Sequence, residues 1–185
     1  MGKVAAVTGY KSFELGIFKE DEPALKYIKA AIQKQLESLL EDGLEWVLIS
    51  GQIGTELWAA EVVFDLQMEY PELKLAVLTP FLGQEEKWSD NNKEYYEMII
   101  SQADFVESVS NQPYTSPAQF RNRDQLFLHK CDAIVILYDE EKEGSPQYFF
   151  KAAKEYKENN SLDIRQITFM DLQWIVEEEQ FNTIN

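Results

Sequence analysis

The stretch Ile49-Ser50-Gly51-Gln52-Ile53-Gly54-Thr55-Glu56-Leu57-Trp58-Ala59-Ala60 decides the fold of this chain. It follows the apolar run Trp46–Ile49, which is typical of a buried strand, and it opens a helical pattern from about Gly54 to Tyr70. A glycine-rich turn between a strand and a helix directs backbone N–H groups and the positive end of the helix dipole toward one point. The turn therefore predicts either an anion site, in which Gly51 and Gly54 let a ligand approach the backbone, or simply a tight connection.

Glu56 favours the anion site or another ligand site over the simple connection. Glu61, Asp65 and Glu69 are spaced four apart and form an acidic stripe on the helix, whereas Glu56 lies roughly opposite, at the head of an apolar stripe. A capping box does not account for this carboxylate, because the residue three positions earlier is Ile53. Acidic residues also favour any first helical turn through the dipole, so that alternative stays open.

Composition limits the class of protein. A chain of 185 residues with 45% hydrophobic residues predicts one folded domain, 1–185, with a short acidic tail that begins at Glu177. The net charge of −16 disfavours a general nucleic-acid or membrane surface. The start Met1–Val4 leads straight into a strand without a signal-peptide layout, and no apolar run is long enough for a membrane span. We therefore expect a soluble, cytoplasmic protein.

Apolar runs and helical patterns alternate along the chain, which predicts an α/β fold with right-handed crossovers and a parallel sheet. Counted along the chain, five expected strands lie in the sheet order 3-2-1-4-5, with helices on both faces. We expect a loop over Lys11–Glu20 and a short extended piece over Phe105–Val109. The five strands are Val4–Val7, Trp46–Ile49, Leu73–Leu78, Ala133–Leu137 and Ile164–Ile167.

Ligands of open parallel sheets bind outside the carboxyl ends of the strands, where the strand order reverses. Four segments are expected to meet there: Thr8-Gly9, Ser50–Glu56, Thr79-Pro80 and Tyr138–Tyr148. In the last of these, Gly144-Ser145-Pro146 again places a small residue and a helix start after a strand. Ser145 is therefore either a ligand contact or an ordinary helix N-cap. The predicted ligand-binding residues are Thr8, Gly9, Ser50, Gly51, Gln52, Gly54, Glu56, Arg123, Asp139, Gly144 and Ser145.

Two arginines, Arg121 and Arg123, stand out in so acidic a chain. The guanidinium group suits phosphate and carboxylate recognition because its donors form a planar fork. Residues two apart on a helix do not share a face, so we expect at most one of the two, Arg123, to reach the site. Pairing with acids such as Asp124 is the alternative. With one His and one Cys, the chain offers no credible zinc cluster, and we expect neither metal nor cofactor.

Three segments of the chain resemble the YpsA family. They are Val7–Lys11 (VTGYK), Ile49–Glu61 (ISGQIGTELWAAE) and Tyr138–Tyr148 (YDEEKEGSPQY), and the resemblance extends over nearly the whole chain. It implies a Rossmann-like fold of the SLOG superfamily, which includes the LOG phosphoribohydrolases and the DNA-processing protein A. Members of that superfamily bind nucleotides or nucleotide-derived ligands, so the resemblance implies a nucleotide-type ligand here.

The resemblance has departures that bear on function. LOG enzymes carry Pro-Gly-Gly-x-Gly-Thr-x-x-Glu after a central strand, and their catalytic glutamate has no obvious counterpart in Tyr138–Tyr148. We therefore expect a non-catalytic sensor of a small phosphorylated ligand that acts through a protein partner. Two alternatives stay open: an N-glycosidic hydrolase of nucleotides with Glu56 or Asp139 as acid/base, and single-stranded nucleic-acid binding through Arg121 and Arg123. The negative charge disfavours the binding of single-stranded nucleic acid.

Overall fold

A central parallel sheet of six strands organises the computed structural model, which describes residues 3–185. The strand order is β4-β3-β2-β1-β5-β6, and every neighbouring pair is parallel. The five predicted strands have the predicted order 3-2-1-4-5, and β4 extends the sheet beside β3. The strands are β1 (Lys3–Gly9), β2 (Leu44–Ile49), β3 (Lys74–Thr79), β4 (Phe105–Ser108), β5 (Ala133–Leu137) and β6 (Asp163–Ile167).

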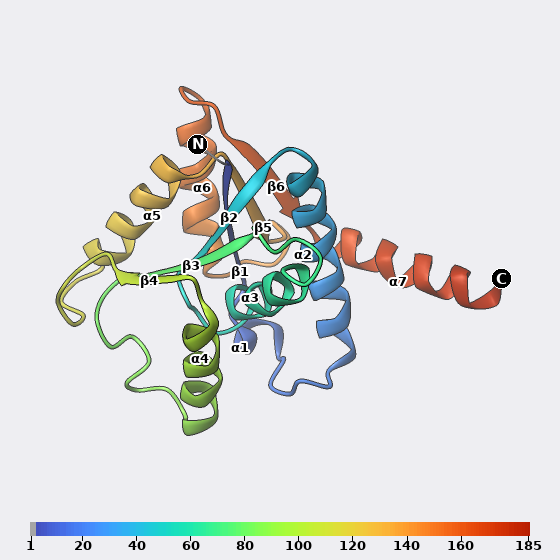
Figure 1. The fold of residues 1–185 in the computed structure, drawn as a ribbon, viewed down its shortest axis with the longest axis horizontal. Helices are drawn as coiled ribbons and strands as arrows, with labels where there is room; N and C mark the ends of the chain where they lie inside the picture. The colour runs from blue at the N-terminus through green and yellow to red at the C-terminus, as the bar shows by residue number, and fades with distance from the viewer. Residues whose placement is uncertain (1–2) are drawn as a thin grey trace.

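Helices cover both faces of the sheet (Figure 1). On one face α2 packs against α3 and α7, and α3 packs against α4. On the other face α5 packs against α6. The helices are α1 (Ser12–Leu15), α2 (Pro23–Glu41), α3 (Thr55–Leu66), α4 (Asp90–Gln102), α5 (Ala118–Lys130), α6 (Pro146–Lys157) and α7 (Phe169–Ile184). None of the helices within residues 3–185 is both long and apolar enough to cross a membrane.

The central strands form the core because both of their faces are covered. All five residues of β5 are buried, and residues 5–7 of β1 are at most 1% exposed. Continuous apolar strands of this kind are typical of parallel sheets that lie between two helical layers. Cys131, the single cysteine, is buried immediately before β5, and burial raises the pKa of its thiol to about 12.

Two expectations for the first half of the chain need correction. The predicted loop Lys11–Glu20 contains the short helix α1, and α3 ends at Leu66 rather than at Tyr70. Four helical residues give no readable apolar periodicity, which is why α1 was not predicted. Residues 67–69 form turns that follow the last helical hydrogen bonds, so the apolar pattern overestimated α3.

The C-terminal segment also differs from the prediction. The tail expected to fray from Glu177 is helical to Ile184, and α7 extends away from the body of the molecule (Figure 1). Trp174 lies in an apolar stretch of the sequence, yet it is 61% exposed. Lys26 on α2 pairs with Glu179, which ties the distal half of α7 to the N-terminal end of α2.

Candidate functional site

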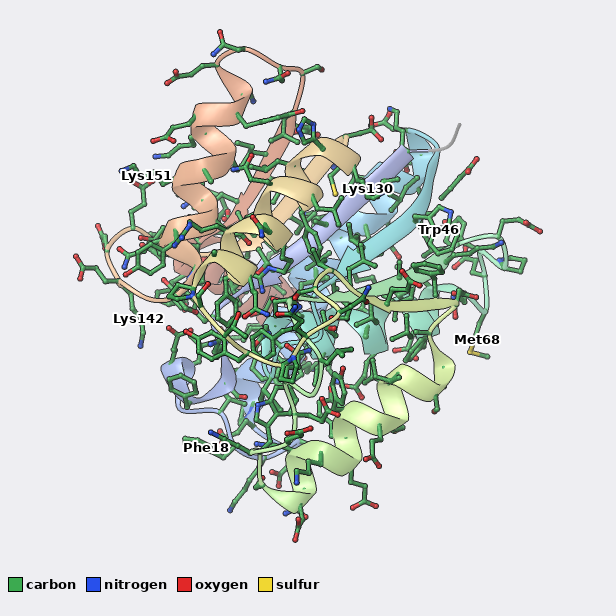
Figure 2. All side chains as sticks on the ribbon, turned by 90° about the vertical axis from the view of Figure 1, so that its left-hand side faces the viewer. Phe18, Trp46, Met68, Lys130, Lys142 and Lys151 are labelled. Atoms are coloured by element: carbon green, nitrogen blue, oxygen red, sulfur yellow. The ribbon has the colours of Figure 1, made fainter. Side chains whose placement is uncertain are left out.

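A pocket of about 630 Å³ lies at the carboxyl ends of β1 and β2, beside the N-terminal halves of α5 and α6. This is the point where the strand order reverses, since the chain connects β1 to β2 on one side and reaches β5 on the other side only after β4. Figure 2 views the side that carries α5 and α6, where Lys142 marks the loop between β5 and α6. The lining residues are Thr8, Gly9, Lys11, Ser50, Gln52, Glu56, Pro117, Phe120, Arg121, Arg123, Asp124, Gln125, Phe127, Ser145, Pro146, Tyr148, Phe149 and Ala152.

Glu56 lies at the pocket floor, in the first turn of α3, and only 5% of the residue is exposed. Its Oε1 atom accepts hydrogen bonds from the backbone N–H groups of Ser50 at 2.6 Å and Gln52 at 3.4 Å. Its Oε2 atom accepts one from Thr8 Oγ1 at 3.1 Å. Burial raises the pKa of Glu56 above its ordinary value, although the charge of Arg123 and these hydrogen bonds oppose the shift. The carboxylate therefore already accepts hydrogen bonds from two backbone N–H groups of the glycine turn.

Arg123 links α5 to the glycine turn. Its Nη1 donates to Ser50 Oγ at 2.9 Å, while its Nε and Nη2 donate to Asp124 Oδ1 at 3.0 and 2.8 Å. The guanidinium carbon lies 5.4 Å from the centre of the Phe120 ring. Arg121 also lines the pocket, is exposed, and has no ion-pair partner among residues 3–185. Both arginines therefore line this pocket, whereas at most one was expected to reach the site, because the pocket runs along α5 and long side chains reach around the helix.

The glycines of the β2–α3 turn serve the chain's own packing. Gly54 has φ +112°, and a Cβ there would lie 2.5 Å from Ser12 N and 2.7 Å from Tyr10 O. Gly51 has φ +79°, and a Cβ there would lie 3.0 Å from the Tyr96 ring. Each glycine therefore permits a left-handed conformation and a close approach by the protein itself. Neither glycine lines the pocket, in contrast to the predicted lining.

At the second strand–helix turn, a carboxylate from α1 occupies the N-terminus of α6. Glu14 Oε1 accepts a hydrogen bond from Ser145 N at 2.7 Å, and Glu14 Oε2 accepts from Ser145 Oγ at 2.8 Å and from Lys11 N at 2.7 Å. Ser145 makes no side-chain N-cap hydrogen bond. Partial burial raises the pKa of Glu14, but the hydrogen bonds from Ser145 and Lys11 outweigh it and hold the pKa below its ordinary value.

Asp139 and Gly144 are not part of the pocket lining. The Asp139 carboxylate accepts from Phe169 N at 3.0 Å, at the start of α7, and from Glu141 N at 3.0 Å. The Tyr10 hydroxyl donates to Lys142 O at 2.6 Å and accepts from Asp139 N at 2.9 Å. These contacts fix the loop after β5, and they leave Asp139 apart from Glu56.

Comparison with known proteins identifies the family of this chain. Residues 5–172 match the YpsA model, described as the YspA SLOG family. The chain belongs to this family. A UPF0398 protein of Bacillus velezensis is 58% identical over 181 residues, covering 98% of this chain and 100% of that protein. A UPF0398 protein of Bacillus pumilus is 60% identical over 177 residues, covering 96% and 94% respectively.

In this YpsA-family chain, seven of the eleven predicted ligand-binding residues line one pocket. They come from three of the four predicted segments and from α5, and Thr79-Pro80 does not contribute. The predicted residues that lie outside the lining are Gly51, Gly54, Asp139 and Gly144. The seven residues in the lining are Thr8, Gly9, Ser50, Gln52, Glu56, Arg123 and Ser145.

The predicted ligand-binding residues did not include the aromatic residues of the lining or Lys11. Phe120 lies one residue before the arginine pair, and Tyr148 and Phe149 lie in the first turn of α6, next to the predicted Ser145. The available signal was their position, since Tyr148 ends the predicted segment Tyr138–Tyr148 and Phe149 follows it. Lys11 follows the predicted Thr8-Gly9 by two residues and lines the same pocket.

A second hollow of about 800 Å³ lies on the other side of the β2–α3 turn, between α1, α3 and α4. Trp58, Trp88 and Tyr95 line it, and Trp88 packs edge-on against Tyr96 with ring centres 5.3 Å apart. Phe18, seen near α1 in Figure 2, lies at its rim and is 77% exposed. Only one of the predicted site residues, Gly54, lines this hollow.

Proposed function

We propose that this protein is a non-catalytic sensor that binds a nucleotide or nucleotide-derived phosphorylated ligand in the 630 Å³ pocket and acts through a protein partner. One observation carries the proposal. Two of the chain's three arginines and Lys11 line a single pocket in a chain of net charge −16. Cations gathered in a hollow of an otherwise acidic surface favour an anionic ligand.

The remaining lining suits the other parts of a nucleotide. Phe120, Tyr148 and Phe149 offer apolar ring surface for a base. The Glu56 carboxylate faces the pocket and can accept a hydrogen bond from a ribose hydroxyl, as acids do in dinucleotide-binding folds. Pockets of several hundred Å³ are of the size that binds small organic ligands.

The test is a calorimetric and thermal-shift screen with nucleotides. A nucleotide at about 100 times its dissociation constant should raise the unfolding free energy by roughly 2.7 kcal/mol. Arg123→Ala should weaken the binding of that ligand by about 1–3 kcal/mol, through loss of a charge-assisted hydrogen bond. Arg121→Ala should also weaken it. Arg165→Ala is the matched control, because it removes the same charge at β6, where Arg165 pairs with Asp163. Equal loss in all three variants would contradict the assignment of the pocket.

N-glycosidic hydrolysis is the second candidate. The observation that favours it is Glu56, a buried carboxyl group with a raised pKa that lines the pocket. The second predicted acid/base, Asp139, does not line this pocket and caps α7 instead. Chromatography of adenosine monophosphate incubated with the protein decides the matter. The sensor proposal expects no free adenine, whereas release of adenine that disappears in Glu56→Gln would establish the hydrolase.

Single-stranded DNA binding is not favoured by the charge distribution. Several phosphate contacts are needed for DNA affinity, and the pocket gathers only Lys11, Arg121 and Arg123 within an acidic surface. We expect no binding to a single-stranded oligonucleotide tighter than about 10 µM at physiological salt. A gel-shift series at several salt concentrations measures this. Sub-micromolar affinity with a steep salt dependence would overturn the sensor proposal.

A further inference from the structure

The N-terminus of α6 is a place where phosphates commonly bind, because free backbone N–H groups and the helix dipole meet there. In this chain an internal anion occupies it. The Glu14 carboxylate accepts hydrogen bonds from the backbone and the hydroxyl of Ser145, at 2.7 and 2.8 Å. Ser145 lines the pocket, so Glu14 lies directly behind the pocket wall.

The surrounding chain is shaped to hold Glu14 in this position. A Cβ on Gly144 would lie 3.1 Å from Glu14 Oε1 and 2.7 Å from the Tyr10 ring, so the missing side chain leaves room for both. Glu14 also accepts from Lys11 N at 2.7 Å, which closes the first turn of α1. The lowered pKa of Glu14 keeps the carboxylate ionised at neutral pH.

The other backbone anion site of the pocket is filled in the same way. Glu56 takes the N–H groups of Ser50 and Gln52 in the glycine turn. Arg123 is already paired with Asp124 at 2.8 Å. The other cations of the lining are Arg121 and Lys11, and the Glu14 carboxylate accepts a hydrogen bond from the backbone N–H of Lys11.

We propose that Glu14 is a specificity-determining residue that restricts the pocket to nucleotides of low charge, nucleoside monophosphates in preference to di- and triphosphates. The inference rests on the proposed function. A single phosphate group is matched by the cations of the lining, Arg121, Arg123 and Lys11. A second or third phosphate group that extends toward α6 meets the Glu14 carboxylate, at a position where a phosphate-binding fold would offer free N–H groups. The two negative charges repel each other.

The test compares the affinities of adenosine mono-, di- and triphosphate by calorimetry, with chelator present, for the wild type and Glu14→Gln. In the wild type the affinity should fall roughly tenfold or more from mono- to triphosphate. Glu14→Gln should raise triphosphate affinity by roughly tenfold and monophosphate affinity by much less. Glu20→Gln is the matched control, since it removes the same charge from the segment after α1 but lines only the second hollow. It should leave the order of affinities unchanged.

A second measurement does not depend on nucleotide binding. Millimolar inorganic pyrophosphate should not raise the melting temperature of the wild type, but it should raise that of Glu14→Ala, in which the donors of Ser145 are free. If no nucleotide binds any variant, the proposed function fails, while a pyrophosphate response confined to Glu14→Ala still supports the role of Glu14. If the wild type binds mono- and triphosphate equally, or Glu14→Ala gains no response, the specificity proposal is overturned even where nucleotide binding stands.

Discussion

At both the β2–α3 turn and the β5–α6 turn, a glutamate carboxylate accepts a hydrogen bond from a backbone N–H group, but the two glutamates come from different parts of the chain. At the β2–α3 turn, Glu56 bonds the N–H group of Ser50, six residues earlier in the chain. At the β5–α6 turn, Glu14 bonds Ser145, which lies 131 residues away. Glu56 is buried and its pKa is raised, whereas Glu14 is partly exposed and its pKa is lowered. One carboxylate is thus part of the core and the other is a docked surface group.

A strand–helix turn can therefore lose its vacant anion site in two ways. A carboxylate from the same helix needs no distant segment, so it is built into the turn as the turn forms. A carboxylate from a distant segment has to be brought in by the fold, and here Tyr10, Gly54 and Gly144 make that approach possible. Disturbing the Glu56 contact should therefore lower the free energy of unfolding more than disturbing the Glu14 contact.

The largest difference between the two turns is expected for the variants Gly54→Ala and Gly144→Ala. At position 54 a Cβ would force a strained φ of +112° and meet the backbone atoms Ser12 N and Tyr10 O. We expect a loss of about 3–5 kcal/mol of unfolding free energy, from strain and overpacking together. At position 144 the obstacles are side chains, which can shift, so we expect about 1–2 kcal/mol. Urea denaturation measures both losses, and equal values would contradict the expected difference between the two turns.

Removing the two carboxylates should give the next largest difference. Glu56→Ala leaves the buried Ser50 N–H without its partner at 2.6 Å, and we expect a loss of about 2–4 kcal/mol. Glu14→Ala exposes donors near the surface, where water can replace the carboxylate, and we expect about 1 kcal/mol, as for a lost helix cap. The free energy of unfolding from urea titrations gives both values. A larger loss for Glu14→Ala would reverse our ranking of the two turns.

The smallest expected effect is that the free energy of unfolding of the variants Glu56→Gln and Glu14→Gln, measured relative to the wild type, depends on pH in opposite directions. For Glu56, whose folded pKa is raised, the stability contribution is present below the unfolded pKa of about 4.3 and is lost as pH rises through the folded pKa. For Glu14, whose folded pKa is lowered, the contribution is present above about 4.3 and is lost as pH falls through the folded pKa. The stability difference between wild type and Glu56→Gln should therefore fall with rising pH, and that for Glu14→Gln should rise. The differences are measured by urea titrations at a series of pH values above and below about 4.3. If both differences change with pH in the same direction, the directions of the two pKa shifts are contradicted.

Sequence patterns predicted the central sheet because its strands are continuous apolar runs. They gave β4 only as a loose extended piece, since Phe105–Ser108 is a short edge strand that buries little and so has no strong burial pattern. Trp174 shows the limit of periodicity, which predicts that a helix has an apolar face but does not say whether another element covers it.

For the candidate site, sequence reasoning located residues whose position follows from one turn. Glu56 was predictable from its place after a strand and opposite the acidic stripe. Glu14 was not, because its contact with Ser145 depends on how α1 folds back across the ends of two strands. The same holds for the glycines: the sequence marks Gly54 as unusual, but only the fold shows that the atom approaching it is Ser12 N and not a ligand atom.

The reaction of the Cys131 thiol with an alkylating reagent can report local opening of the protein around β5. The single thiol is buried before β5, and its raised pKa keeps it protonated at neutral pH, so an alkylating reagent in solution meets neither an accessible nor a reactive sulfur. Alkylation then proceeds only through molecules in which the central strands have transiently separated from α5. The alkylation rate of Cys131, followed by mass spectrometry, therefore reports the opening equilibrium of each variant under native conditions, without denaturant and without an engineered probe.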